Sequence, residues 1–244
     1  MSALAVMLIA MGIADVTRRL TDRSWVPPAV APAVVVGCAV LAGLWHAGDI
    51  VLLQIAAAAS VVWVVLCARA ERTGERELTP LVVFGTAVGL LILLSGWGSD
   101  VAGLVARWST WAALPGSDVT PDRVLMVIGV VLLQMVTGNQ LVRLVLGSVD
   151  AVKPAGEPQA SDRLKGGRLL GPMERLLILG LGLAGQLAAA TAVVAAKSII
   201  RFPEINAQKV RENGQIGIDD ITEYFLVGSF ASWIVALGGL VLAQ

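Results

Sequence analysis

Long, uninterrupted apolar runs constrain this sequence more than any other feature. A helix of about 20 residues, rising about 1.5 Å per residue, crosses the hydrocarbon core of a bilayer, and several runs here reach about that length. The runs do not alternate between polar and apolar residues, which argues against membrane strands. The chain is 57% hydrophobic with a mean hydropathy of +0.80, whereas soluble domains are about 45–50% apolar. We therefore predict an all-α, polytopic transmembrane helical bundle.

The runs predict about seven spans. Residues 2–14 are apolar, which is short for a span. This segment either continues through Asp15 to Leu20 and spans, as we prefer, or it is re-entrant or interfacial. In the spanning case Asp15 can pair with Arg18 or Arg19, three and four residues later. The predicted spans are residues 2–20, 27–46, 50–68, 81–97, 124–146, 173–198 and 223–243.

Residues 100–113 predict a further helix, which is amphipathic. Val101, Leu104 and Trp108 recur at helical spacing, as in a helix at the membrane interface; a loop helix packed on the bundle is an equally ordinary interpretation. The chain divides into a five-span N-terminal membrane region with this interfacial helix (1–148), a flexible cytoplasmic loop (149–172) and a C-terminal two-span region (173–244).

Arg175, Gln186 and Lys197 interrupt the sixth predicted span at intervals of eleven residues. Eleven residues make three turns at about 3.67 residues per turn, so a continuous helix places all three on one line. The line is about 33 Å long and puts Gln186 near the midplane of the bilayer. Either the two cations extend to opposite interfaces while Gln186 bonds a neighbouring helix, or the three residues form a polar track for permeation or substrate binding.

Other polar residues extend the hypothesis of a polar track. Gln134 and Asn139 lie inside the fifth span, where hydrogen bonding between helices is the default interpretation. Glu223 begins the last span and can pair with Lys197, either to gate a path or to hold two helices together. The predicted polar track consists of Gln134, Asn139, Arg175, Gln186, Lys197 and Glu223.

The residues Lys165, Gly166, Gly167 and Arg168 precede the sixth span. Two cations, two glycines and the free N–H groups of a helix start suit an anionic lipid head group or a phosphate. A plain basic loop on the cytoplasmic side is the simpler interpretation.

Four stretches in the last third of the chain carry a resemblance: GGRLLGPMER, AGQ, AAKSIIRF and EYFLVGS. They resemble a family of bacterial polytopic inner-membrane proteins known only as a domain of unknown function. The first helix of that family typically has an acidic residue preceded by a histidine; here Asp15 is present, but Met11 stands where the histidine is expected. The resemblance implies a bacterial inner-membrane protein and supplies no activity. The matching positions are Gly167, Arg168, Gly171, Glu174, Arg175, Gly185, Gln186, Lys197, Ser198, Arg201, Phe202, Glu223, Tyr224 and Phe225.

The composition argues against several functions. The 18 basic and 18 acidic residues balance, which gives no reason to predict nucleic-acid binding. Cys38 and Cys67 each lie in an apolar run, and with the single His46 they form neither a disulfide framework nor a metal motif. The sequence contains no nucleophile–base constellation. We predict no catalytic residue, no metal and no cofactor, and we favour a protein that is not an enzyme.

Basic residues predict the orientation, because cytoplasmic loops collect lysine and arginine. Seven spans place most of the 18 basic residues on one side, with the N-terminus outside and the C-terminus in the cytoplasm. If residues 173–198 instead form a re-entrant pair, the 199–222 loop moves to the cytoplasmic side.

Three hypotheses for function follow. The first is a channel- or transporter-like protein, assembled as a homo-oligomer in the lipid bilayer, with a polar track in the bundle. The second is a non-catalytic membrane subunit or effector that acts through protein partners. The third is a membrane enzyme acting on a lipid-phosphate substrate, in which Arg168 and Arg175 hold phosphate and Glu174 is the base.

Overall fold

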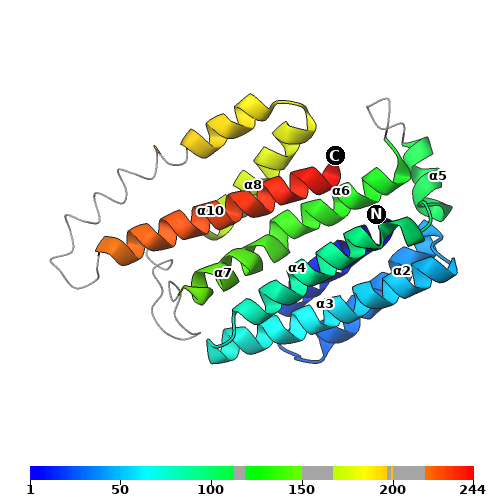
Figure 1. The fold of residues 1–244 in the computed structure, drawn as a ribbon, viewed down its shortest axis with the longest axis horizontal. Coiled ribbons are helices and arrows are strands. Elements are labelled where there is room, and N and C mark those ends of the chain that lie inside the picture. The colour runs from blue at the N-terminus through cyan, green and yellow to red at the C-terminus, as the bar shows by residue number, and fades with distance from the viewer. Residues whose placement is uncertain (113–118, 150–166, 197–198, 200–217) are drawn as a thin grey trace.

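The computed structural model describes residues 1–112, 119–149, 167–196, 199 and 218–244. Within these residues all regular structure is helical, so the predicted all-α fold class is confirmed. The long helices run along one common axis and pack side by side (Figure 1).

Helix α1 (Ser2–Leu20) is the central helix of the bundle. Its residues from Ala3 to Met11 are between 0 and 6% exposed, and helices α2, α3 and α6 pack against it. A helix that is apolar on every face can be buried on every face. This explains why the predicted span with the shortest apolar run takes the innermost position.

Helices α2 (Val26–Ala42), α3 (Ala47–Thr73) and α4 (Leu78–Leu93) follow as successive neighbours (Figure 1). The first turn of α2 contains proline, whose missing N–H would have no partner in the helix there. At the start of helix α3, the Asp49 carboxylate accepts the backbone N–H of His46, the residue that precedes the helix, at 3.1 Å. It ends at Gly74, which has a left-handed backbone. The second and third predicted spans, residues 27–46 and 50–68, correspond to α2 and α3, which pack against each other.

A 3₁₀ turn, η1 (Ser95–Trp97), and helix α5 (Gly103–Trp111) lie at the end of the bundle where α4 ends. Helix α5 packs against α2 and α6. Trp108 and Trp111 are 48 and 83% exposed, which suits tryptophans at the head-group level of a bilayer. The extra helix predicted within residues 100–113 is present.

Helices α6 (Pro121–Leu132) and α7 (Gly138–Ser148) form one continuous rod through a π-helical turn, η2 (Leu133–Thr137). The rod corresponds to the fifth predicted span, residues 124–146, but the sequence did not predict the π turn. A π turn adds one residue to the helix, so a carbonyl in it is released from the regular hydrogen-bond ladder.

The prediction of one continuous helix over residues 173–198 is wrong. Helix α8 (Gly167–Leu183) stops, and a second helix, Leu187–Ala196, turns back beside it (Figure 1). The two helices form a hairpin, as in the re-entrant alternative. The last helix, α10 (Ile218–Ala243), packs against α6, α7 and α8.

Glycine chemistry explains why α8 stops. Gly185 has a φ of +74°, a conformation that glycine adopts without steric cost. The N–H of Gln186 bonds the Leu181 carbonyl at 2.8 Å, and the N–H of Gly185 bonds the Gly182 carbonyl at 3.0 Å. This pair of bonds satisfies carbonyls at the helix end and reverses the chain direction.

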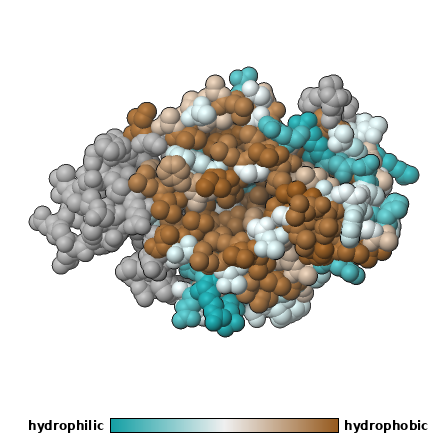
Figure 2. Space-filling view, in the orientation of Figure 1, coloured by the Kyte–Doolittle hydropathy of each residue, from teal (hydrophilic) through white to brown (hydrophobic). Residues whose placement is uncertain are grey.

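Three helices are long and apolar enough to cross a membrane: Ala47–Thr73, Pro121–Ser148 and Tyr224–Ala243. Apolar side chains cover the middle of the face shown in Figure 2, and hydrophilic side chains gather at the right-hand end and the lower edge. Large exposed apolar residues on α10, such as Ile234 at 70% and Val241 at 72%, have no cover among the described residues. A lipid solvent accounts for them, so the chain is a membrane protein; the predicted count of seven spans is not confirmed.

Hydrogen bonds place both ends of the chain at the same end of the bundle. The Ser2 hydroxyl bonds the carbonyl of Ser99 at 3.2 Å, near the start of α6. Arg123, at the start of α6, donates its Nε to the Ala243 carbonyl at 3.2 Å. The placement of the two termini on opposite sides of a membrane stays a prediction, which this arrangement does not support.

Candidate functional site

Arg175, on α8, is buried inside the protein at 1% exposure. Its Nε and Nη2 donate to the Gln134 carbonyl at 3.0 and 2.9 Å. Its Nη2 also donates to Asn139 Oδ1 at 2.6 Å, and its Nη1 donates to Ser232 Oγ at 3.1 Å. We call Arg175, Gln134, Asn139 and Ser232 the Arg175 cluster.

The π turn supplies the main acceptor of this cluster. Gln134 lies in η2, where its carbonyl faces the guanidinium instead of serving only the helix ladder. Gly138 follows the turn, and a Cβ at that position would stand 2.9 Å from Arg175 Nε. The absence of a side chain at Gly138 therefore lets the guanidinium approach the rod.

Helix α10 closes around the same cluster. The Gln134 side chain donates its Nε2 to the Val235 carbonyl at 2.9 Å, and a Cβ at Gly239 would overlap that nitrogen. The indole of Trp233 donates to Glu174 Oε1 at 2.8 Å. These contacts join α8, α10 and the α6–α7 rod, which share no loop within the described residues.

The structure brings together three of the six residues of the predicted polar track: Gln134, Asn139 and Arg175. Gln186 lies exposed in the turn after α8, because the helix that would have carried it inward ends first. Lys197 lies outside the described residues. Glu223 is on α10, but its side chain is outside the part of the chain that the structure describes.

The predicted head-group site is described only in part. Lys165 and Gly166 lie outside the described residues. Gly167 and Arg168 begin α8, so the helix starts earlier than expected; their side chains are not described.

Two residues of the enzyme hypothesis have other contacts. That hypothesis places a phosphate on Arg175 and makes Glu174 the base. Arg175 instead donates to protein oxygens, and Glu174 accepts from the Trp233 indole. The arrangement gives the enzyme hypothesis no support.

A second polar cluster surrounds Asp15 on α1, and we call it the Asp15 cluster. Trp63 Nε1 donates to Asp15 Oδ2 at 3.2 Å, and Arg18 Nη2 lies 3.5 Å from Asp15 Oδ1. Arg18 Nη1 reaches Glu71 Oε2 at 3.1 Å, and the other oxygen of Glu71 lies 4.0 Å from Arg143 Nη1. The sequence predicts Arg18 or Arg19 as the partner of Asp15, and the structure shows Arg18. The sequence gives no sign of Trp63, Glu71 or Arg143.

Exposure rises steadily along this chain of charges. The side chains of Asp15, Arg18, Glu71 and Arg143 are 1, 15, 29 and 42% exposed, in that order. Burying an ionised group costs several kcal/mol unless it is paired, and each charge here has an opposite neighbour. The cluster is therefore a chain of paired charges that runs from the interior of the protein to its surface.

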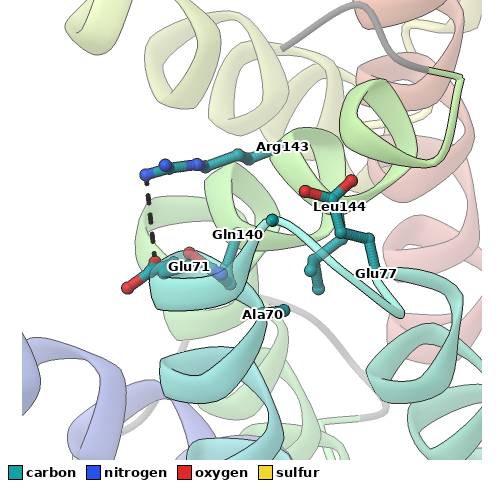
Figure 3. A pocket seen from close by; sticks show the side chains of 7 residues that line it. Ala70, Glu71, Glu77, Gln140, Arg143 and Leu144 are labelled. Carbon is teal, nitrogen blue, oxygen red and sulfur yellow. Dashed lines mark ion pairs between the residues drawn. The ribbon is translucent and has the colours of Figure 1, made fainter. Parts of the chain in front are cut away.

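The outer end of this chain of charges is a small pocket of about 10 Å³, room for about one water molecule. In Figure 3, Glu71 and Arg143 form an ion pair on one side, Glu77 lies on the other side, and Gln140 lies between them. The remaining lining residues are Ala70, Gly74 and Leu144. The pocket opens at the end of the bundle where α3 ends, opposite the two termini.

A third set of polar contacts, between Asp49 and Ser99, lies at the end of the bundle that holds both chain termini, and it has a structural role. The Asp49 carboxylate accepts the Ser99 N–H at 2.7 Å and the Ser99 hydroxyl at 2.6 Å, besides its cap on α3. These bonds hold the segment after η1 against the start of α3. Among the described residues, no group of three or more His, Cys, Asp or Glu side chains could hold a metal ion.

The chain matches no protein-family model, no curated protein and no solved structure. The resemblance of its last third to an uncharacterised bacterial family therefore remains a prediction.

Proposed function

We propose that this protein is a multi-pass membrane protein of the channel or transporter class, in which the Asp15 cluster forms the polar path. The observation that carries the proposal is the graded exposure from Asp15 to Arg143 at the pocket. Ionisable residues inside a membrane are costly and mark ion or substrate pathways by default. The Arg175 cluster supports the path by fixing the α6–α7 rod that carries Arg143.

We propose that the pocket faces the cytoplasm of a bacterial cell. Arg69 and Arg72 lie near the end of α3 and Arg76 follows it, beside the pocket, and the cytoplasmic side of a membrane protein collects such residues. Both termini then lie on the outer side of the inner membrane. We propose that the protein lies in the lipid bilayer, binds an anionic lipid at the cytoplasmic face and assembles with further copies of itself as a homo-oligomer.

Reconstitution tests the proposal. The purified protein is placed in vesicles, and proton or alkali-cation flux is measured for the wild type, for Asp15→Asn and for Glu71→Gln. We expect flux in the wild type and a loss of at least about tenfold in both variants, the effect of roughly 1.4 kcal/mol on a barrier. Asp49→Asn is the matched control, because Asp49 is buried but lies outside the path. Equal flux in all four proteins would refute the path.

The second candidate is a non-catalytic membrane subunit or effector. One observation favours it: beyond Asp15, toward the termini, α1 is sealed in apolar contacts from Ala3 to Met11. A protein without any conducting state would show no flux in the vesicle assay. It would instead retain specific partners when isolated from native membranes under mild conditions.

A further inference from the structure

Four buried polar atoms gather around Asp15 without a hydrogen-bond partner among the described residues. They are Asp15 Oδ1, Arg18 Nε, Thr137 Oγ1 and Gln140 Nε2. Thr137 and Gln140 are 0 and 5% exposed. Thr137 is within reach of the Asp15 carboxylate and Gln140 is within reach of the Cys67 thiol, but neither contact has the geometry of a full hydrogen bond. Cys67 also lies near Asp15 and Arg18. Three elements, α1, η2 and α7, thus direct polar atoms that lack a hydrogen bond into one small region.

This region connects to the pocket. Gln140 lines the pocket beside Glu71 and Arg143 (Figure 3), while its Nε2 is one of the four unpaired atoms. Buried polar groups without protein partners are normally satisfied by ordered water when the site is polar and two or more groups converge on it. The row of polar atoms from Gln140 to Asp15 meets that description.

We infer that these atoms line a hydrated inlet through which Asp15 takes up and releases a proton from the pocket end of the bundle. The inference rests on the proposed function and names the ion that the site binds. A hydronium ion in the inlet gives its proton to Asp15 Oδ1 and leaves as water. Oδ2 keeps the hydrogen bond from Trp63, so Oδ1 is the oxygen that receives the proton.

Arg18 couples the protonation of Asp15 to the charges at the pocket. Its guanidinium lies between two carboxylates, at 3.5 Å from Asp15 and 3.1 Å from Glu71. When Asp15 is ionised, Arg18 forms ion pairs with both carboxylates. When Asp15 is neutral, Arg18 pairs with Glu71 alone. Protonation of a buried carboxylate is thereby coupled to a movement of charge toward the pocket.

The surrounding charges favour a proton over a metal cation. Arg18 and Arg19 face Asp15 from α1, and Cys67 lies near it on α3. Glu71 on α3 pairs with Arg18, and Arg143 on α7 reaches the same Glu71. Helices α2 and α4 contain no charged residue. A metal ion needs several oxygen ligands, whereas a proton needs only one oxygen.

Infrared difference spectroscopy tests the inference directly. The protein in lipid nanodiscs is titrated from high to low pH, and the carbonyl stretching band of protonated carboxyl groups is recorded. We expect a band in the wild type that is missing in Asp15→Asn and retained in Asp49→Asn. Gln140→Leu keeps the Asp15 carboxylate and removes one polar wall of the inlet. After transfer of this variant to D₂O, the Asp15 band should shift about fivefold to tenfold more slowly than in the wild type, the effect of about one hydrogen bond.

Each outcome decides one question. A titration with no band that depends on Asp15, in the wild type or in Gln140→Leu, overturns the inference even where vesicle flux depends on Asp15; another ion is then transported. An Asp15 band without any vesicle flux leaves the inference standing and removes the transport function. A deuterium shift that is equally fast in Gln140→Leu overturns the inlet, because the proton then reaches Asp15 by another route.

Discussion

Replacing Gly138 with alanine tests whether the Arg175 cluster depends on close approach to the π turn. The new Cβ would stand 2.9 Å from Arg175 Nε and 3.0 Å from the Leu133 carbonyl oxygen. A flexible arginine could normally move away, but this guanidinium is fixed by four hydrogen bonds. The clash must therefore break bonds or move a helix.

The magnitude follows from two opposing terms. Overpacking of a well-packed site costs about 1–3 kcal/mol, while alanine in place of glycine stabilises a helix by about 1 kcal/mol. Gly180 on α8 is the matched control, since a Cβ there meets nothing within 4 Å. Gly180→Ala should raise the free energy of unfolding by up to about 1 kcal/mol, and Gly138→Ala should lower it by about 1 kcal/mol.

The assay is equilibrium unfolding of both variants and the wild type in the same mixed micelles. The test compares the free energies of unfolding of the two variants with each other, so the contribution of the unfolded state in detergent cancels. A Gly138→Ala protein that is as stable as Gly180→Ala would refute the account of the Arg175 cluster.

Two further predictions concern residues of the predicted polar track. Arg175→Lys keeps the charge but loses the planar fork, so at least one acceptor among its partners is left unpaired, and unfolding should become easier by about 1–3 kcal/mol; equal stability in the unfolding assay would contradict the hydrogen-bond assignment. Gln186→Leu should change neither vesicle flux nor stability, because Gln186 lies exposed in the turn after α8. A loss of flux in that variant would instead favour the continuous track that the residue spacing predicted.

Some of the fold could be predicted because its cause is local. Apolar runs of membrane length predicted α2, α3, α4, the α6–α7 rod and α10. Tryptophans at helical spacing predicted α5. These elements depend on which side chains are apolar over one stretch of chain, and that information is present in the residues themselves.

The break in the sixth predicted span shows where such reasoning fails. The eleven-residue spacing of polar residues is meaningful only if the helix is continuous, and the composition of the segment is apolar enough to assume so. Gly185 was the available signal, because glycine after a helical run favours a stop. The run of apolar residues on both sides concealed it.

The candidate site was the hardest part to predict, because its partners are distant along the chain. Trp63 and Glu71 lie 48 and 53 residues from the α1 residues that they bond. Only the packing of α1 in the centre of the bundle brings them together. Arg143 lies in an apolar run, and nothing in its sequence neighbourhood indicates Glu71 as its partner.

Sided labelling of a pocket residue tests the central claim most directly. Cys38 and Cys67 are first replaced by serine, and Arg143→Cys at the pocket, where the native side chain is 42% exposed, is compared with Ala5→Cys on the buried half of α1. A membrane-impermeant thiol reagent is applied to right-side-out and to inverted vesicles from bacterial inner membranes. We predict that position 143 reacts only in inverted vesicles and that position 5 reacts in neither. Reaction of position 143 from the outer side, or of position 5 from either side, would contradict a path that opens only at the pocket.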